Sequence, residues 1–224
     1  GTSPWVYLSG KYPNGERILL QSNATFIYKY IDDGTTIQTV DSLRIDWDIF
    51  SSFGWNFLMA KNHVYFTYDP KFDPANNEFT SIFKFTDADT TDPYSAFLPL
   101  DTLNFGDIGV PRVQHFSINY DGDIVFHSEK DPSGAFAIVG VMDQDFIVKD
   151  TLHYPTDSDE EVRHNTFAVD EHNSMYAVST KAMRRFDWDG TNLSIGWIAP
   201  YDFINDGPTG SFAKGSGTTP SLMG

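Results

Sequence analysis

Cysteine is absent from the 224 residues, which excludes disulfides, thiolate metal sites and thiol nucleophiles. Basic residues are also few: 15 Lys and Arg stand against 31 Asp and Glu, giving a formal charge of −16. Such a charge repels phosphate backbones and anionic membrane surfaces, so we do not expect nucleic acid as a partner. No apolar run approaches the ~20 residues that span a bilayer, so no membrane span is expected either.

Sequence motifs of several enzyme classes are also missing. There is no GxSxG elbow, HExxH pair, Walker loop, dinucleotide fingerprint or EF-hand loop with glycine at its sixth position. Hydrolase, metalloprotease, kinase and Rossmann functions therefore have no support from motifs. Two N-glycosylation sequons begin at Asn23 and Asn192, but such matches also arise by chance in a chain rich in Asn, Ser and Thr. We expect a secreted or periplasmic location.

What the sequence does contain is one pattern repeated three times, at intervals of roughly fifty residues. Each copy is a short apolar strand, a tight polar turn and a second apolar strand: GWNFLMAKNHVYFTY from Gly54, QHFSINYDGDIVFHS from Gln114 and NTFAVDEHNSMYAVS from Asn165. Because Asp-Gly and Asn-containing dipeptides tolerate positive φ, each copy is predicted to be a hairpin. The predicted turns are Lys61-Asn62, Asp121-Gly122 and His172-Asn173. This alignment puts Leu58, Ile118 and Val169 in one column, and Val64, Ile124 and Met175 in another.

Self-similarity at this period is typical of a β-propeller, in which each blade is a small sheet that buries its faces against its neighbours. Three blades are evident, and strands predicted at Arg17–Leu20, Thr25–Ile31 and Thr36–Val40 form a partial fourth at the N-terminal end. The pattern weakens over Asp87–Gly109, which we interpret as a long connection with one short strand. A sustained helical period is absent, so we expect at most a turn or two of helix, at Asp157–Val162. The predicted fold class is all-β, a propeller of about four blades.

A family likeness is carried by the C-terminal quarter of the chain. Its features are HNTFAVDEHNSMYAVSTKAMRRFDWDG from His164, then Trp197, Tyr201-Asp202, and GSGTTPSLMG at 215–224. Together with the general repeat, these residues resemble β-propellers of the quinoprotein, YVTN and gluconolactonase-like superfamily. In that class a GSGTTP run opens the inner strand of the next blade. The resemblance therefore implies one partial propeller domain over 1–224, with 215–224 as the start of a further blade.

A partial propeller needs a partner. An open set of three or four blades would expose an apolar blade face and a sheet edge. We therefore expect this chain to be part of a larger propeller. The preferred partner is a second polypeptide, the other product of a cleaved precursor; alternatively, the rest of the propeller is simply missing from the sequence.

Two histidines are candidates for catalysis or metal binding. In propellers the inner strand of each blade lines the central channel; His115 opens one predicted inner strand, and His164 with Asn165 opens the next. An arginine precedes each, Arg112 and Arg163. Two imidazoles at a channel mouth can bind a divalent metal or act as general base and acid. Alternatively, each histidine caps a strand and bonds a loop carbonyl. The other histidines are predicted to lie at the surface: His63, His127, His153 and His172.

Acidic and aromatic residues give two further candidate sites. Asp87, Asp89 and Asp92 have the best spacing for calcium, which takes six to eight oxygen ligands, although solvated loop acids are the better explanation. Aromatic residues recur near equivalent blade positions, as ligand platforms or as packing between blades. The predicted ligand-binding residues are Trp55, Arg112, Arg163, Asn165, Trp197 and Tyr201.

Fold does not determine function here, because propellers include both binding modules and enzymes. The leading hypothesis is a secreted or periplasmic protein that binds a small ligand at its central channel. The alternative is a channel-site enzyme, with a metal or with His115 and His164 as the acid/base pair, acting on a lactone or sugar-like molecule. A quinone-dependent dehydrogenase is a third hypothesis, but the tryptophan-docking repeats of that family are not visible.

Overall fold

The computed structural model describes residues 6–22, 25–44, 57–69, 79–110, 112–131, 133–162, 168–202 and 222. Over these ranges the secondary structure is almost entirely β, with short 3-10 turns at Lys61–His63 and Phe105–Ile108. The expectation of little helix is confirmed for these residues, and Asp157–Val162 contains a turn instead. None of the described helical segments is long and apolar enough to cross a membrane. The chain divides into two compact units, Gly1–Asp107 and Ile108–Gly224.

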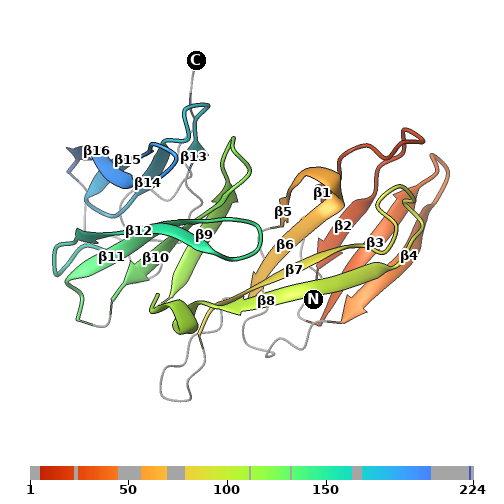
Figure 1. Ribbon diagram of the computed structural model, residues 1–224, viewed down its shortest axis with the longest axis horizontal. Coiled ribbons are helices and arrows are strands. Elements are labelled where there is room, and N and C mark those ends of the chain that lie inside the picture. Colours follow the sequence, from red (N-terminus) through yellow and green to blue (C-terminus); the bar gives the residue numbers. More distant parts are fainter. Residues whose placement is uncertain are drawn as a thin grey trace. The chain divides into compact units, whose positions relative to one another are not determined.

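The first unit contains two four-stranded antiparallel sheets, whose strands follow one another in chain order (Figure 1). Blade A consists of β1 (Tyr7–Leu8), β2 (Leu19–Ser22), β3 (Phe26–Asp32) and β4 (Ile37–Arg44). Blade B consists of β5 (Leu58–Met59), β6 (Val64–Asp69), β7 (Ser81–Asp87) and β8 (Phe97–Asn104). In β3, the sequence FIYKYID buries every second residue, because successive side chains of a strand point to opposite faces.

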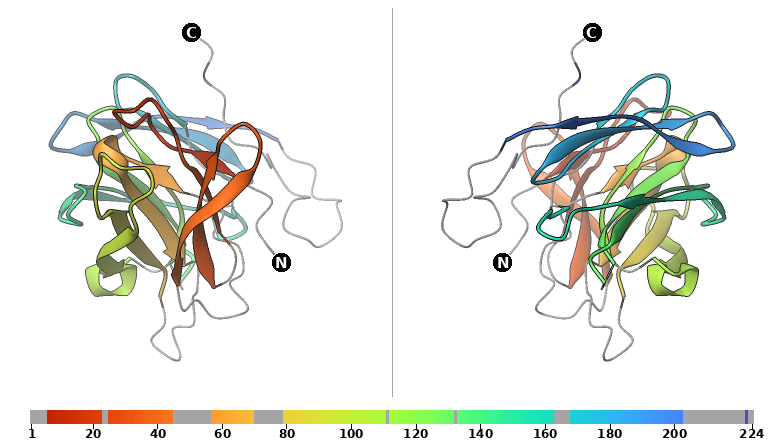
Figure 2. Two further views of the ribbon diagram at one scale, coloured as in Figure 1. Left: turned by 90° about the vertical axis from the view of Figure 1, so that its right-hand side faces the viewer. Right: turned by 90° about the vertical axis from the view of Figure 1, so that its left-hand side faces the viewer.

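The second unit has the same plan. Blade C consists of β9 (Val113–Ile118), β10 (Ile124–Lys130), β11 (Phe136–Met142) and β12 (Val148–Pro155). Blade D consists of β13 (Ala168–Val169), β14 (Met175–Val178), β15 (Ala182–Trp188) and β16 (Leu193–Pro200). Figure 2 shows the strands of blade D (blue) lying across those of blade C (green). Four sequential four-stranded meanders confirm the predicted all-β, propeller-type fold with four blades.

Two details of the predicted blades are wrong. Blade A is a complete four-stranded sheet, not a partial one. The region Asp87–Gly109 holds the eight-residue strand β8 rather than one short strand. Outer strands have a weak signal because both of their faces meet solvent, and five consecutive residues of β8 are exposed. The apolar alternation that reveals a half-buried strand is therefore lost.

The predicted turn alignment is right in the second and third copies and off by one residue in the first. Ile118 pairs with Ile124, and Val169 with Met175, as aligned. In the first copy, however, the equivalent pair is Met59 and Tyr65. The turn thus lies at Asn62 and His63, which both have positive φ, 61° and 56°. Residues other than glycine adopt this left-handed conformation infrequently, so no sequence signal distinguished Asn62-His63 from Lys61-Asn62 as the turn.

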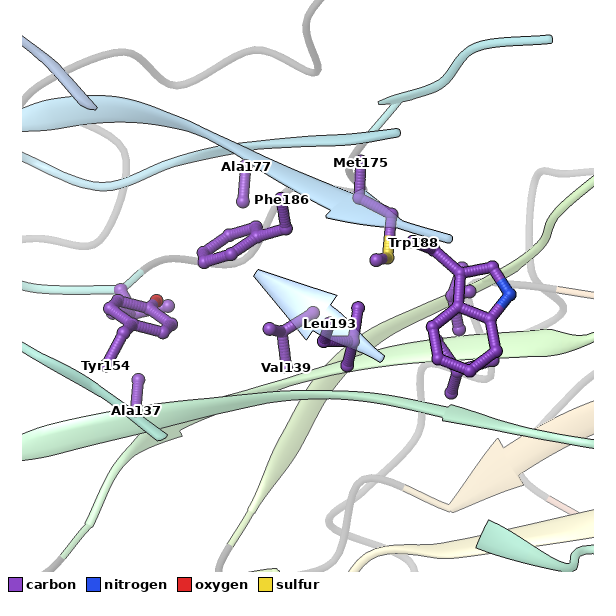
Figure 3. Packing of buried hydrophobic residues seen from close by; sticks show 11 residues of the cluster. Ala137, Val139, Tyr154, Met175, Ala177, Phe186, Trp188 and Leu193 are labelled. Carbon is purple, nitrogen blue, oxygen red and sulfur yellow. The ribbon is translucent and has the colours of Figure 1, made fainter. Parts of the chain in front are cut away.

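Among the described residues, each unit contains a hydrophobic cluster to which both of its sheets contribute. In the first unit the core members are Tyr12, Ile18, Leu20, Ile27, Ile31, Phe57, Tyr65, Phe85 and Phe97. In the second they are Val125, Ala137, Val139, Val141, Tyr154, Val162, Met175, Ala177, Phe186, Trp188 and Leu193. Figure 3 shows Phe186 and Met175 of blade D directed toward Val139 and Tyr154 of blade C. Apolar burial between paired blades therefore holds each unit together.

Candidate functional site

A hollow lies in the second unit at the end of the sheets where the first strand of each blade begins, which we call the proximal end. Its volume is about 300 Å³. The lining residues are Glu129, Lys130, Ser158, Asp159, Glu160, Glu161 and Val162. They come from the end of β10 and from the connection that leaves β12 for blade D. The hollow is therefore built where the chain passes from one blade to the next.

Backbone hydrogen bonds fix this connection against blade D. The amide of Thr180 donates to the carbonyl of Glu161 at 2.9 Å, and the amide of Glu161 donates to the Thr180 hydroxyl at 2.9 Å. Val162 forms a β-bridge with Ser179. The lining side chains are consequently carried by a segment with a defined backbone.

Two lysines hold the acidic turn of the hollow. Lys130 Nζ donates to the carbonyl oxygens of Asp157, Ser158 and Glu160, at 2.8, 3.0 and 2.8 Å. Lys181 Nζ donates to the carboxylate of Asp157 at 3.2 Å and to that of Asp159. Three carbonyls around Lys130 use all three of its N–H donors. Both ammonium groups are thus committed to the protein itself.

The floor of the hollow is a buried ion pair. Arg184 makes a two-pronged contact with Glu160, with Nη1 to Oε1 at 2.6 Å and Nη2 to Oε2 at 3.1 Å, the geometry in which such pairs are strongest. The Glu160 and Arg184 side chains are only 2% and 8% exposed, and Ser179 also donates to Glu160. Burial alone would raise the pKa of Glu160, but the hydrogen bonds from Arg184 and Ser179 outweigh it and lower that pKa.

Behind the ion pair lies a closed histidine–tyrosine pair. His127 Nε2 is 2.5 Å from the Tyr154 hydroxyl, and Arg184 Cζ lies 5.1 Å from the Tyr154 ring centre. Burial, followed by the positive charge of Arg184, lowers the pKa of His127 to about 3. Burial also raises the pKa of Tyr154. The prediction that His127 is a surface residue is therefore wrong: it is 3% exposed, and its imidazole is neutral at pH 7.

A second polar cluster lies in the core of the first unit. Lys29 Nζ is 2.7 Å from Asp87 Oδ1, and both side chains are fully buried. The hydroxyls of Tyr12 and Tyr65 also donate to Asp87. Burial is the main reason that the pKa values of both tyrosines are raised. His63 stacks on Tyr12 at 3.8 Å and is only half-buried. Apart from His63, the cluster is sealed from solvent, so it is a structural network rather than a ligand site.

Several predicted site residues lie apart from one another. His115 is 3% exposed and pairs across the sheet with His127. Arg112 stands beside the hollow, with Nη1 3.2 Å from Glu129 Oε1. Tyr201 is also beside the hollow. Its hydroxyl donates to the Ser179 carbonyl, and its amide donates to the Lys181 carbonyl. Trp197 lies on β16 and is 37% exposed. Outside the described residues are Trp55, Arg163, His164 and Asn165, and also 215–224 apart from 222.

The three predicted calcium ligands do not converge. Asp87 points into the core onto Lys29. Asp89 and Asp92 are exposed and accept hydrogen bonds from the amides of Thr91 and Tyr94, two residues ahead of each. These are Asx turns, in which the carboxylate shapes its own loop. Among the described residues, no three His, Asp or Glu side chains are placed to hold a metal ion.

Sequence reasoning missed Lys29, Lys130, Glu160 and Arg184. Lys29 had a detectable signal, because it occupies a buried phase of the alternation in FIYKYID. A charge at such a position indicates a buried partner. Arg184 shows the same signal in the alternation of β15. Glu160 and Lys130 had none, since their roles depend on a loop conformation.

Comparison with known proteins gives one curated relative, which matches over part of its length. No protein-family profile matches the chain. An uncharacterized protein of Archaeoglobus fulgidus is 37% identical over 110 residues, which are 48% of this chain and 20% of that protein. The chain thus spans only about a fifth of the curated relative it matches.

Among solved structures, similarity extends to a gluconolactonase, with 10% identity, a TM-score of 0.44, and 86% of this chain and 63% of that one covered. A luciferin-regenerating enzyme has 12% identity and a TM-score of 0.29, covering 96% and 80%. The extracellular domain of a one-component system from B. thetaiotaomicron has 8% identity and a TM-score of 0.30, covering 87% and 33%. At these values the likenesses carry no information about activity.

Proposed function

We propose that this protein is a ligand-binding module whose hollow at the proximal end of blades C and D takes a small, uncharged, polyhydroxylated molecule such as a sugar or a sugar lactone. The observation that carries the proposal is the hollow's lining, in which polar groups of both signs face one cavity of about 300 Å³. That volume lies at the lower end of the range for small-molecule sites.

Charge pairing favours an uncharged ligand. Three of the lining carboxylates already have a cationic partner: Glu129 with Arg112, Asp159 with Lys181, and Glu160 with Arg184. An ionic ligand would have to displace one of these partners. Hydroxyl groups can donate to the remaining carboxylate lone pairs without doing so, because each hydroxyl is both donor and acceptor.

Binding is favoured over catalysis by the position of the histidines. His115 and His127 are both buried, and neither is among the residues lining the hollow. A general base has to come within hydrogen-bond reach of the proton it takes. A channel-site enzyme that uses His115 and His164 is therefore the second candidate, and a secreted or periplasmic location is part of the proposal.

The test is isothermal titration calorimetry of the whole chain against glucose, myo-inositol and gluconolactone, with gluconate and glucosamine as charged analogues. We expect the neutral compounds to bind about tenfold or more tightly than the charged ones, a difference of about 1.4 kcal/mol. Glu129→Gln and Glu161→Gln should weaken binding, whereas Asp145→Asn at the opposite end of blade C should not.

Two results would contradict the proposal. One is the absence of binding heat with all five compounds at about 10 mM, a concentration well above the largest dissociation constant expected for a specific site. The other is turnover of gluconolactone that His115→Asn abolishes without unfolding the protein, which would put the enzyme hypothesis first.

A further inference from the structure

Within each unit the two blades pack against each other, and we call this interface a junction. The A–B junction and the C–D junction bring the same strand positions face to face. In every blade, a β-bulge in the pairing of the third and fourth strands comes directly after one third-strand residue: Lys29, Lys84, Val141 or Arg185. We call the face of a blade that carries this residue its forward face. On blade A the forward face includes Leu20, Ile27 and Lys29, and on blade C it includes Val125, Val139 and Val141.

On blades A and C the forward face is completely buried. All six of these residues are 0–1% exposed. Lys29 of blade A meets Asp87, the last residue of the third strand of blade B. Val141 of blade C shares an apolar core with Trp188, the last residue of the third strand of blade D. A cation is thus matched by an anion, and an apolar residue by an apolar residue.

A carboxylate reinforces both junctions from the fourth strand. The residue paired with Lys29 is Asp41, which accepts the amide of Phe97 in blade B at 2.6 Å. The residue paired with Val141 is Asp150, which accepts the amide of Leu193 in blade D at 2.7 Å. Phe97 and Leu193 are the first residues of β8 and β16. The same bond therefore joins two different pairs of blades.

Blade D has a forward face of the same construction, but it is open. Its members are Tyr176, Met183 and Arg185, with Trp197 at the position of Asp41 and Asp150. All three residues of the face are only half-buried, and Trp197 is 37% exposed. The Tyr176 and Trp197 rings lie 6.0 Å apart, and Arg185 Cζ lies 6.0 Å from the Tyr176 ring centre. The surface is aromatic and carries one cation.

Arg185 is held on its own blade in a way that leaves bonding capacity. Its Nε is 2.6 Å from Asp187 Oδ1, and its Nη2 donates to Ser174 at 3.1 Å. Its Nη1 has no hydrogen-bond partner among the described residues. A side chain added at Gly196 would lie 2.4 Å from Asp187 Oδ2, so the glycine makes room for this arrangement. The guanidinium is thereby fixed in place with one edge available.

From these positions we infer that the forward face of blade D binds a further blade-type sheet, contributed by the remainder of a longer polypeptide. The sheet presents a carboxylate to Arg185, as Asp87 does to Lys29, and apolar side chains to Tyr176 and Trp197. Aromatic residues and arginine are the types that dominate such interfaces. The curated relative, of which the matched stretch is only 20%, has ample chain for further blades.

The inference is independent of the proposed ligand site and is tested without it. Hydroxyl-radical labelling is measured on the 224-residue chain alone and on this chain within the protein purified from its natural source. We expect labelling of Trp197 and Met183 to fall by about tenfold in the natural protein, since half-exposed side chains would enter an interface core. Trp188, 5% exposed, and Tyr120, 68% exposed, serve as the buried and exposed references.

Charge variants identify the partner's chemistry. In the natural protein, Arg185→Glu should restore labelling of Trp197, because it sets two carboxylates against each other. The matched control is Lys149→Glu, which reverses a similarly exposed cation that also pairs with a carboxylate. Increased labelling of the buried Trp188 would show that Arg185→Glu unfolds the sheet. In that case Arg185→Gln, which removes the charge without reversing it, is measured instead.

Three outcomes would overturn the inference. Equal labelling of Trp197 in the two samples would show that nothing covers the face. Protection that appears in the 224-residue chain alone and rises with its concentration would assign the face to a second copy. If Trp197 stays protected in both Arg185→Glu and Arg185→Gln, the partner sheet does not present a carboxylate to Arg185.

Discussion

The junction between blades A and B and the junction between blades C and D use the same strand positions for different chemistry. At the first, Lys29 and Asp87 form a fully buried ion pair that two tyrosine hydroxyls complete. At the second, the equivalent positions hold Val141 and Trp188 in an apolar core. In the second unit the buried ion pair is formed instead by Arg184 and Glu160, at the proximal end beside the hollow.

This difference separates what the backbone fixes from what side chains choose. Bulge, strand pairing and the carboxylate-to-amide bond recur at both junctions. A buried charge pair, by contrast, gains little over an apolar contact, because desolvation offsets its Coulomb attraction. Blades can therefore exchange the two chemistries without changing their stacking. The Arg184–Glu160 pair bears on the proposed ligand site because Glu160 lines the hollow.

The largest expected effect comes from breaking the A–B ion pair. Asp87→Asn removes the charge that compensates Lys29, and we expect a loss of about 3–5 kcal/mol in unfolding free energy because Lys29 stays buried. Urea denaturation followed by circular dichroism measures it. The double variant Lys29→Met with Asp87→Leu should recover most of the loss by copying the apolar C–D junction.

A loss of less than 1 kcal/mol for Asp87→Asn, about that of an ordinary surface change, would contradict the buried pair. The exposed Asp89→Asn serves as the control, because its carboxylate only shapes its own turn.

Acid should weaken the C–D unit through His127. The pKa of His127 is about 3 in the folded protein, against an ordinary value of 6.5. The unfolded chain therefore binds the proton more readily, and stability falls as the pH drops from about 6.5 toward about 3, by about 1.4 kcal/mol per unit. Urea midpoints at a series of pH values measure the slope.

His127→Gln should flatten that slope, while His172→Gln, whose side chain is 79% exposed, should leave it unchanged. A wild-type slope that His127→Gln does not alter would assign acid sensitivity to other groups.

The carboxylate-to-amide bonds should contribute equally at the two junctions. Asp41→Ala and Asp150→Ala each remove one charge-assisted hydrogen bond, so each should cost about 1–2 kcal/mol. Hydrogen exchange should accelerate at the Phe97 amide in the first variant and at the Leu193 amide in the second. Asp107→Ala, at an exposed carboxylate, is the control. Unequal losses would show that the repeat is geometric but not energetic.

The smallest effect concerns the turns between the first two strands of blades B, C and D. Equivalent positions are His63, Gly122 and Asn173, and all have positive φ. Gly122→Ala should cost about 1 kcal/mol, since alanine is disfavoured there, whereas Gly122→Asn should cost less because asparagine tolerates this conformation. Equal losses in thermal unfolding would mean that the contact with Gln144, not the backbone angle, decides the cost.

The fold was largely predictable because the repeat carries it. Turn dipeptides and apolar alternation located the strands of blades C and D, and the columns Ile118–Ile124 and Val169–Met175 are real cross-strand pairs. The outer strand β8 escaped prediction because solvent covers both its faces. The turn of the first repeat was predicted one residue too early, because His63 occupies a position where glycine or asparagine is usual.

The candidate site was much less predictable. Arg112 and Tyr201 were predicted and lie beside the hollow, but the residues that form it were not. Lys130 binds three carbonyls of a turn almost thirty residues further along the chain. No local pattern marks such a contact, because it depends on how the connection between blades folds back.

The sequence by itself determined the all-β class, the hairpins and the repeat, since these follow from local alternation and turn chemistry. Only the tertiary structure decided which charges are buried and which partner each receives. Lys29 and Arg185 occupy the same position in their blades, yet one is sealed against Asp87 and the other is half-exposed on an open face. The physical reason is that burial of a charge depends on the neighbouring sheet, and local sequence does not encode that neighbour.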